Sequence, residues 1–396
     1  MSKLEQLINE LCPEGVEYRR LENCCEILDN KRKPITKSAR EAGKYPYYGA
    51  NGIQDYVSNY IFDGTFILVG EDGSVVTEMG TPIVTWATGK IWVNNHAHII
   101  SEINGVLLRY LFHYLQTVPV KHLIHGNIPK LTGGDFRALK IAVPPLPVQE
   151  EIVRILDKFV ELTAELTAEL TARKQQYEYY RDDLLSKNTN KKSLKQIALS
   201  SRSGGTPLKS NKYYYENGII PWLRTQEVVF NEINKTDCFI TELAVQETSA
   251  KWIPANCVIV AISGASAGRC AINKIPLTTN QHCLAIEINP EVALYKYVFY
   301  CVCNQYDDLI AKKEGARGDL NSSRILGLEI PIPYPEDKAK SLAEQQRIVD
   351  TLDRFDKLCN DISEGLPAEI EARQKQYEYY RDKLLTFKKK EAAENE

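Results

Sequence analysis

Side chains that can hydrogen-bond to bases or phosphates recur in glycine-rich turns along this chain. Arg, Lys, Asn and Gln can pair with guanine or adenine edges, and Ser, Thr and the backbone amides of glycine turns suit phosphates. We therefore expect nucleic-acid contacts from these turns. The candidates in the first part of the chain are Tyr47, Tyr48, Asn51, Thr88, Lys90, Asn94, Asn95, His96, Asn127 and Lys130. Those in the later part are Ser203, Thr206, Lys209, Arg224, Gln226, Ser263, Ser266, Arg269, Arg317, Asn321 and Arg324.

The same residue types also serve as ordinary turn formers, because Gly, Asn and Ser end strands in any protein. For a single residue that interpretation is the better one, whereas the set as a whole favours binding. His96 and His98 lie two apart on one face of an expected strand and could ligate a metal. No cluster of carboxylates or cysteines accompanies them in the sequence, so we assign no metal site. Glu71 and Asp72 are adjacent acids without a neighbouring base or nucleophile, so we assign no catalytic site.

Motifs of catalysis are missing from the sequence. There is no GxxxxGK phosphate loop, no glycine-rich strand–helix turn suited to an adenosyl cofactor, and no Asn/Asp-Pro-Pro-aromatic motif of an amino-methyltransferase. The 10 cysteines include no CxxC pair, which favours buried free thiols over a zinc site or a disulfide framework. We therefore expect a non-catalytic recognition scaffold without a cofactor of its own. Two alternatives stay open: a DNA-modifying enzyme in its own right, and a coiled-coil scaffold that reads no DNA.

Length and composition suit an ordinary globular protein of two or three domains, with 396 residues of which 43% are hydrophobic and 26% charged. No apolar run approaches the ~18 residues of a membrane helix, and the first residues do not resemble a signal peptide. We therefore expect a cytoplasmic protein. The net charge is −3, although residues 188–343 carry a small excess of basic groups. Affinity for nucleic acid must therefore come from local patches.

An internal repeat defines the elements that position these turns. Residues 172–185 read ARKQQYEYYRDDLL and residues 372–385 read ARQKQYEYYRDKLL, identical at eleven of fourteen positions. Upstream, QEEIVRILDKF (149–159) corresponds to QQRIVDTLDRF (345–355). The segments before these repeats share only a pattern of strands and glycine turns. Nearly identical repeats predict the same contact made twice, whereas divergent globular halves predict two different targets.

Both repeats predict long helices, because apolar residues recur every three or four positions in a stripe of coiled-coil type. Gly365-Leu366-Pro367 interrupts the second stripe and predicts a break there. The first helix contains LTAELTAELTA (162–172), and one TAEL unit at ~1.5 Å per residue spans about 6 Å, or one to two base pairs. We expect the two helices to run antiparallel and to relate the globular halves by a pseudo-two-fold axis.

The fold class that these observations predict is α+β. Two β-rich mixed α/β domains alternate with two long spacer helices, and each domain has one helix late in its sequence, at 105–116 and 293–312. The predicted boundaries are a first domain at 1–148, a spacer at 149–187, a second domain at 188–343, and a C-terminal spacer at 344–390 that is kinked near 365–367.

The whole chain resembles the specificity (S) subunit of type I restriction–modification systems. The phrases YPYYGANGIQDY (45–56), GEDGSV (70–75), WATGKIWVNNHAHI (86–99), IPWLRTQEV (220–228) and AISGASAGR (261–269) are similar to target recognition domains of that family. TAEL repeats followed by ARKxQYEYYR resemble the spacer of its IC-type members.

The resemblance implies a role in defence against foreign DNA. Each target recognition domain would read one half of a bipartite site on double-stranded DNA. The helices would set the gap and dock two methylase (M) subunits, and restriction (R) subunits would join through that complex. S-adenosylmethionine, ATP and Mg²⁺ would belong to those partners, with no membrane contact. The candidates for methylase binding are Gln176, Tyr177, Tyr180, Arg181, Gln376, Tyr377, Tyr380 and Arg381.

Overall fold

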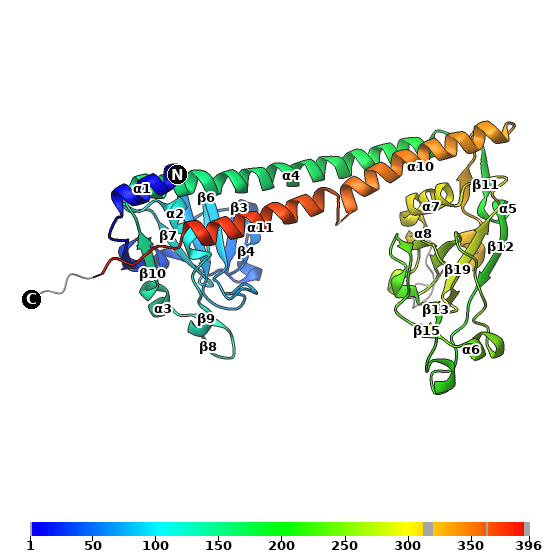
Figure 1. Cartoon of the computed structure of the whole chain (residues 1–396), viewed down its shortest axis with the longest axis horizontal. Helices are drawn as coiled ribbons and strands as arrows, with labels where there is room; N and C mark the ends of the chain where they lie inside the picture. The colour runs from blue at the N-terminus through cyan, green and yellow to red at the C-terminus, as the bar shows by residue number, and fades with distance from the viewer. Residues whose placement is uncertain (1, 312–319, 362, 392–396) are drawn as a thin grey trace, which may run out of the picture. The chain divides into compact units, whose positions relative to one another are not determined.

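The computed structural model describes residues 2–311, 320–361 and 363–391, which form two compact units (Figure 1). Unit 1 comprises residues 1–168 and 368–396, and unit 2 comprises residues 169–367. Each unit therefore combines one globular half with parts of long helices that are far apart in the sequence. Within the described ranges, no helix is both long and apolar enough to cross a membrane.

The globular part of unit 1 is built on a six-stranded mixed sheet of order β2-β7-β5-β6-β3-β4. The central strands β5 and β6 are antiparallel, and β3 runs parallel to β6. A separate two-stranded sheet joins β1 to β10, and β8 and β9 form a short hairpin. The bounds are α1 (Lys3–Leu11), β1 (Glu17–Arg20), β2 (Glu26–Ile27), β3 (Ala42–Gly49), β4 (Gly52–Val57), β5 (Phe62–Gly70), β6 (Val84–Val93), β7 (Ala97–Ser101), α2 (Leu108–Leu115), β8 (Ile124–His125), β9 (Lys130–Leu131), α3 (Gly133–Ala138) and β10 (Lys140–Val143).

Unit 2 has a five-stranded sheet of order β12-β19-β16-β17-β14, a three-stranded sheet β15-β13-β18, and the pair β11-β20. Apolar side chains of the five-stranded sheet pack against α7 in one core cluster. The bounds are β11 (Lys191–Ser193), α5 (Leu194–Ile197), β12 (Ala198–Ser203), β13 (Ile220–Leu223), β14 (Glu232–Ile233), β15 (Phe239–Ile240), α6 (Glu242–Glu247), β16 (Val258–Ala261), β17 (Cys270–Asn273), β18 (Thr278–Thr279), β19 (Cys283–Ile288), α7 (Tyr295–Asn304), α8 (Tyr306–Ala311), α9 (Ser322–Leu326) and β20 (Glu329–Pro331).

The expected late helices are shorter than the sequence predicts. The first, expected at 105–116, is α2, and the second, expected at 293–312, is divided into α7 and α8. All ten cysteines are free thiols, and only Cys238 and Cys303 are not fully buried. The expectation of buried free thiols is therefore confirmed for eight of them.

The spacers follow the sequence with shifted ends. The helix predicted at 149–187 is α4 (Leu146–Ser186), a continuous helix of 41 residues. The helix predicted at 344–390 consists of α10 (Lys338–Asn360) and α11 (Leu366–Leu384). It begins earlier because the Asp337 side chain accepts a hydrogen bond from the Lys340 amide and caps α10. The expected break is present, with Pro367 in the first turn of α11, where a missing N–H costs little.

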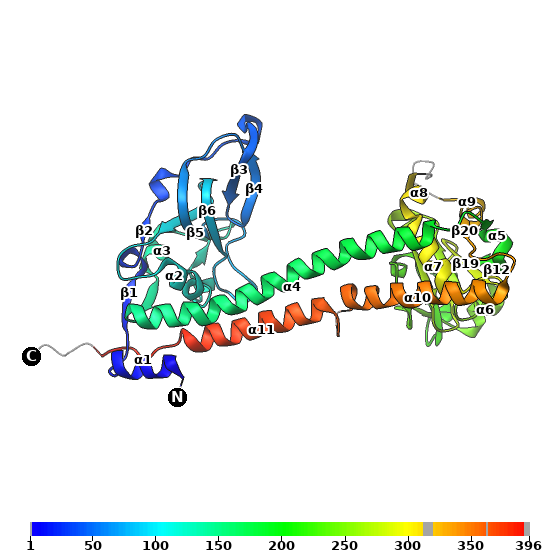
Figure 2. The ribbon, with the colours of Figure 1, turned by 90° about the horizontal axis from the view of Figure 1, so that it is seen from above.

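Each unit packs a globular half on two helix segments, α4 with α11 in unit 1 and α4 with α10 in unit 2 (Figures 1 and 2). In unit 1 the ring of Phe159 stacks on that of Tyr380, with centroids 5.3 Å apart. In unit 2 the corresponding rings of Phe355 and Tyr180 stack at 5.7 Å. Farther toward the end of α4, Leu185 joins the core cluster that contains Ile348, so α4 and α10 run antiparallel.

A buried glutamine joins each globular half to its helix in the same way. In unit 1, the Gln149 side chain accepts from the Leu107 amide at 2.9 Å and donates to the Gly105 carbonyl at 3.0 Å. In unit 2, Gln345 accepts from the Leu294 amide at 2.9 Å and donates to the Val292 carbonyl at 3.2 Å. The glutamine that is repeated in the sequence therefore makes the same contacts in both units.

An aspartate eight residues after this glutamine, about two helical turns farther along, makes a second joint, which differs between the units. In unit 1, Asp157 contacts Nε of Arg109 at 2.7 Å and Nε2 of His113 at 2.9 Å, and Nδ1 of His113 lies 2.8 Å from the Tyr377 hydroxyl. In unit 2, a lysine and a tyrosine take the places of Arg109 and His113, because Lys296 and Tyr300 both contact Asp353. Only the joint in unit 1 contains a histidine.

Candidate nucleic-acid interface

A buried asparagine organises the corresponding loop in each unit. In unit 1 the Asn94 side chain accepts from the His96 amide at 2.8 Å, and in unit 2 Asn280 accepts from the His282 amide at 3.1 Å. The Asn94 amide nitrogen donates to Gln54, whereas that of Asn280 donates to Thr225. Asn94 and Asn280 are 2% and 8% exposed. Both therefore hold the loop from inside, and the residues that follow them face outward.

Three loops of unit 1 meet where β5 ends and β7 begins, at the paired residues Gly70 and Ala97. Residues 70–73 run on from the last residue of β5, residues 94–97 lead from β6 to the first residue of β7, and the β8–β9 hairpin spans 124–131. The Glu71 amide donates to the His96 carbonyl at 2.9 Å, and the Gly73 amide donates to the Pro129 carbonyl at 2.9 Å. The His96 ring also pairs with Asp72. These bonds bring Asn95, His96, Asn127 and Lys130 to one place, although their sequence positions span 35 residues.

Beneath these loops lies a group of charged and titratable side chains that we call the Glu71 cluster. It consists of Asp29, Arg32, Glu71, His98 and Lys130. Nη1 of Arg32 lies 2.6 Å from Oε2 of Glu71, and Nζ of Lys130 lies 3.2 Å from Oε1. Nδ1 of His98 lies 2.7 Å from Oδ2 of Asp29. The rings of His98 and Phe136 stack with centroids 4.2 Å apart.

The two carboxylates of the cluster remain ionised although they are largely buried. Burial raises the pKa of Glu71, but the hydrogen bond from Arg32 and the charge of His98 lower it more. Burial also raises the pKa of Asp29, and the hydrogen bond from His98 outweighs it. The sequence showed no carboxylates near the histidines, but the fold places both beside His98, with ligand atoms within 4.8 Å of one another. Arg32 and Lys130 already supply the positive charge that a metal ion would bring.

The predicted residues of unit 1 fall into two groups. Tyr47, Tyr48 and Asn94 are buried, and the Tyr47 hydroxyl is hydrogen-bonded to the backbone of Ile35, so these three side chains support the surface from within. The exposed ones are Asn51, Thr88, Lys90, Asn95, His96, Asn127 and Lys130. Thr88 and Lys90 lie within β6, apart from the loop cluster, and Nζ of Lys90 stands 4.7 Å from the centre of the Tyr60 ring.

In unit 2 several predicted residues surround the loop after Asn280. Thr206 donates a short hydrogen bond to Gln281. The 3-10 helix Thr225–Glu227, which carries exposed Gln226, contacts the 3-10 helix Gly264–Ser266. The Arg224 guanidinium lies between Glu227 and Asp237, each 3.6 Å away. The fold therefore gathers Thr206, Arg224, Gln226, Ser263 and Ser266 on one side of unit 2.

The remaining predicted residues of unit 2 have mixed positions. Ser203 ends β12, and Lys209 lies in an exposed turn. Arg269 is partly exposed at the end of the glycine turn before β17. Asn321 caps α9 by accepting from the amide of Arg324, which places both residues in a structural motif. Arg317 lies outside the described residues.

The predicted partner-binding residues divide into an inner and an outer set. Tyr377 and Arg381 are 5% and 6% exposed, and Tyr177 packs against the core of unit 2. Tyr180 and Tyr380 are 39% and 40% exposed, and Gln176, Arg181 and Gln376 lie at or near the surface. The sequence interpretation missed the most exposed aromatic residues of the repeat, Tyr179 at 68% and Tyr379 at 62%.

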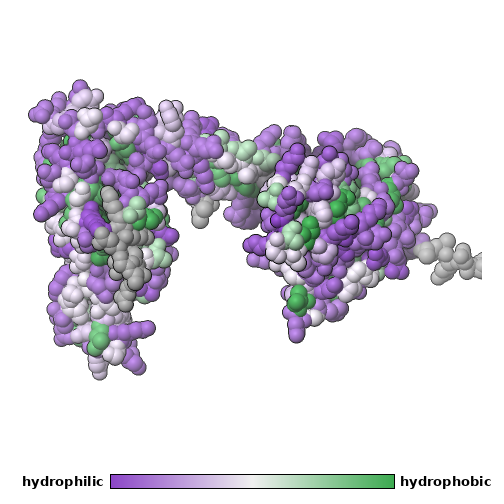
Figure 3. Space-filling view, turned by 180° about the vertical axis from the view of Figure 1, so that it is seen from behind, coloured by the Kyte–Doolittle hydropathy of each residue, from purple (hydrophilic) through white to green (hydrophobic). Residues whose placement is uncertain are grey.

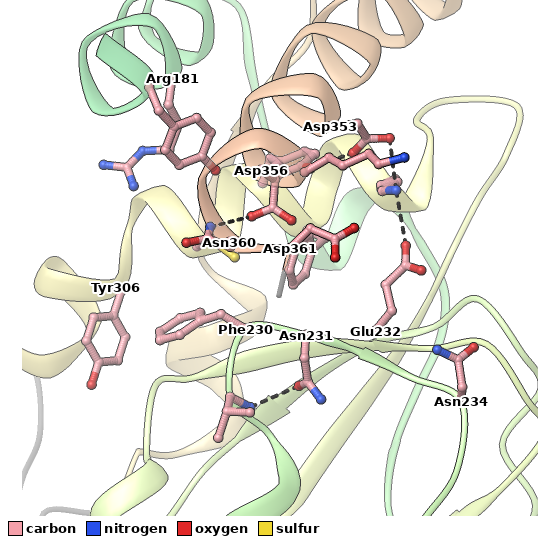
Figure 4. Close-up of a pocket in the computed structure, with 17 residues that line it drawn as sticks. Arg181, Phe230, Asn231, Glu232, Asn234, Tyr306, Asp353, Asp356, Asn360 and Asp361 are labelled. Carbon is pink, nitrogen blue, oxygen red and sulfur yellow. Dashed lines mark hydrogen bonds and ion pairs between the residues drawn. The ribbon is translucent and has the colours of Figure 1, made fainter. Parts of the chain in front are cut away.

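An open groove of about 1310 Å³ lies in unit 2 between α4, α7, α10 and the segment 229–234. Figure 4 shows Asp353, Asp356 and Asn360 of α10 along one side and Phe230, Asn231 and Glu232 on the opposite side. Lys296 bridges Asp353 at 2.9 Å and Glu232 at 3.1 Å. Repeat residues Tyr177 and Arg181 also line this groove.

Several residues that build these surfaces were not identified from the sequence. Examples are Asp29, Arg32, Gln54, Gln281 and His282. The repeated Asn-x-His at 94–96 and 280–282 was a usable signal, because it marks the same buried asparagine in both halves. Asp29 and Arg32 gave no such signal, since His98 and Glu71, to which they bind in the cluster, lie 69 and 39 residues away in the sequence. The face in Figure 3 is mostly hydrophilic, with hydrophobic residues in separate areas, which suits a polar partner.

Comparison with known proteins follows the same division of the chain. The family model described as "Type I restriction modification DNA specificity domain" matches residues 13–173 and 186–372. The type I restriction enzyme EcoR124I/EcoR124II specificity subunit of Escherichia coli is 39% identical over 307 residues, 74% of each chain. A putative type I restriction enzyme specificity subunit of Haemophilus influenzae is 35% identical over 393 residues, covering 94% of this chain and 96% of its own.

Solved structures support the fold. The S subunit of a type I restriction–modification system from M. genitalium has a TM-score of 0.56 at 16% identity, with 94% of this chain and 96% of that chain covered. The expected α+β class with two sheet-rich domains and long helices is therefore confirmed. The family expected from the repeat and the target-domain phrases is confirmed as well: the chain belongs to the DNA specificity subunits of type I restriction–modification systems, whose catalytic functions reside on partner subunits.

Proposed function

We propose that each unit of this chain reads one half of a bipartite site on double-stranded DNA. The strongest support for this proposal is that the two units share a frame of buried contacts but differ in exposed side chains. Asn94 and Asn280 hold corresponding loops in the same way, and Gln149 and Gln345 make the same joint. On that frame the exposed residue after the asparagine is Asn95 in unit 1 and Gln281 in unit 2, although a histidine follows in both. Such differences in exposed residues are expected for readers of two different sequences.

Methylome sequencing of cells that carry this chain with its neighbouring methylase tests the proposal. A bipartite motif with one methyladenine in each half, separated by a fixed gap, supports it and supplies both half-sites. A chain that reads no DNA gives no new motif, and binding of the purified complex to random duplexes is then independent of sequence. A DNA-modifying enzyme in its own right would methylate or cut DNA without partner subunits.

We also propose that two copies of a methylase subunit dock on the exposed faces of the repeat. Tyr179 and Tyr180 form an edge-to-face pair with centroids 5.6 Å apart, and Tyr379 and Tyr380 form the same pair at 5.3 Å. The three positions that differ between the repeats, at residues 174, 175 and 183, lie outside these pairs. Aromatic residues are favoured anchors in protein interfaces, and two identical faces suit two copies of one partner.

Single substitutions test this docking surface. Tyr179→Ala and Tyr379→Ala should each remove one methylase subunit from the complex, and the double variant should remove both. Lys174→Ala is the matched control, because this exposed position differs between the repeats. Native mass spectrometry of the mixture gives the stoichiometry. Full occupancy in the double variant would exclude these faces as the docking sites. We further propose that translocating restriction subunits, with ATP and Mg²⁺, join through the same complex and that the complex acts in the cytoplasm.

A further inference from the structure

The Glu71 cluster ties together segments of unit 1 that are distant in sequence. Besides Glu71, Nη1 of Arg32 donates to the Ala97 carbonyl at 2.6 Å, at the end of the 94–97 loop. Nε2 of His98 donates to the Leu131 carbonyl at 3.1 Å, at the base of the β8–β9 hairpin. Oδ1 of Asp29 accepts from the Ile99 amide at 3.0 Å. The cluster therefore contacts all three loops of the candidate interface through their backbones or side chains.

The ions of this cluster are held in a fixed arrangement. His98 is 1% exposed, and the side chains of Arg32 and Glu71 are 11% and 12% exposed. Both ring nitrogens of His98 lie against oxygen atoms, the Asp29 carboxylate on one side and the Leu131 carbonyl on the other, so the ring is held from both sides. Exchange of hydrogen-bond partners within the cluster has a high free-energy cost, because it would leave a buried charge unpaired.

Stability alone does not account for such a cluster. A buried ionic network is often no more stabilising than well-packed apolar side chains of similar volume. In the corresponding strand of unit 2, an apolar residue takes the place of the histidine. His98 of β7 is paired in register with Val69, and Leu284 of β19 is paired in the corresponding way with Val260. Leu284 is buried in the core of unit 2. In unit 1, the charged cluster instead makes directional hydrogen bonds and ion pairs to three loops.

We propose that the Glu71 cluster is a positioning element for base recognition by unit 1. It holds the loops 70–73 and 94–97 and the β8–β9 hairpin as one surface, so that Asn95, His96 and Asn127 meet the first half-site in a fixed geometry. Asp29, Arg32, Glu71 and His98 act through these loops and do not touch DNA. The inference rests on the proposed function, and it predicts that the cluster controls discrimination at one half-site only.

The test uses the complex of the full chain with its methylase subunits. Glu71→Gln removes the central charge and keeps the side-chain shape. Glu78→Gln is the matched control, since Glu78 is exposed on the segment after the same loop. Dissociation constants are measured for three duplexes: the full site, the site with half-site 1 scrambled, and the site with half-site 2 scrambled. We expect Glu71→Gln to reduce the preference for the intact half-site 1 about tenfold, roughly the discrimination of one bidentate base contact.

Under the proposal, the preference for half-site 2 stays at the wild-type value in both variants. Equal behaviour of Glu71→Gln and Glu78→Gln, or an equal loss of preference at both half-sites, would overturn the positioning role while leaving DNA recognition intact. A wild-type complex that does not distinguish the three duplexes would instead refute the proposed function. Should Glu71→Gln melt below the assay temperature, Asp29→Asn, which can keep its bond to the Ile99 amide, carries the same expectation.

Discussion

Replacing a buried glutamine of the spacer with leucine should strongly destabilise unit 2. Gln345 is fully buried, accepts from the Leu294 amide at 2.9 Å, and donates to the Val292 carbonyl and the Ser341 hydroxyl, both at 3.2 Å. Leucine fits the space but leaves the Leu294 N–H and the Val292 carbonyl without these partners. Each buried unsatisfied group costs about 1–3 kcal/mol, so we expect a loss of about 3 kcal/mol.

The next residue of the same helix provides the control. Gln346 is exposed and donates to exposed Asp350 at 2.7 Å, so Gln346→Leu should change stability by no more than about 0.5 kcal/mol. For a unit of this size, 1 kcal/mol corresponds to about 2–4 °C in Tm. Differential scanning calorimetry should therefore show Gln345→Leu melting about 6–12 °C below Gln346→Leu. Equal melting temperatures would refute the view that this amide fixes the globular half to its helix.

Three further predictions concern the joints and the spacer. Gln149→Leu should lower the Tm of unit 1 as Gln345→Leu lowers that of unit 2, and an unchanged Tm would contradict the equivalence of the joints. Burial lowers the pKa of His113, so the unfolded chain takes up a proton that the folded chain resists. The contribution of His113 to the stability of unit 1 should therefore be fully present above about pH 6.5 and should decrease as the pH falls below that value. Thermal melts should show that His113→Tyr, which copies Tyr300 of unit 2, weakens this loss of stability at low pH. An unchanged pH dependence would exclude His113 as its source. Inserting one TAEL unit after Leu170 should lengthen the gap of the methylated motif by one or two base pairs without altering its halves, and a constant gap would exclude the spacer as a ruler.

The helices were predictable because their pattern is local. The apolar stripe and the repeated phrases placed α4, α10 and α11, and Gly365-Leu366-Pro367 placed the break. The sequence did not show which segments share a unit. Tyr177 belongs to unit 2 and Tyr377 to unit 1, so each globular half packs on the end of the other spacer. This pairing of each globular half with the other spacer depends on tertiary packing, and the spacing of apolar residues in the sequence does not indicate it.

The turns were recognisable, but the direction of their side chains was not. Residue type identified Tyr47, Asn94 and Asn95 equally well, yet only Asn95 is exposed. Tyr47 faces inward because its hydroxyl has backbone partners at Ile35, and Asn94 because it holds the His96 amide. Burial of a polar residue depends on partners supplied by the fold, so composition and spacing cannot separate a base contact from a loop support.

The most direct test of independent half-site reading is an exchange of one globular half. Residues 17–143 begin on β1 and end on β10, which pair antiparallel, so the two ends of this segment lie side by side. The segment can therefore be replaced by that of another family member. Methylome sequencing of the hybrid with its methylase then gives both half-sites. We predict that one half-site changes to that of the donor and the other stays as in the parent. A change in both half-sites, or in neither, would contradict the conclusion that each unit reads its own half of the DNA site.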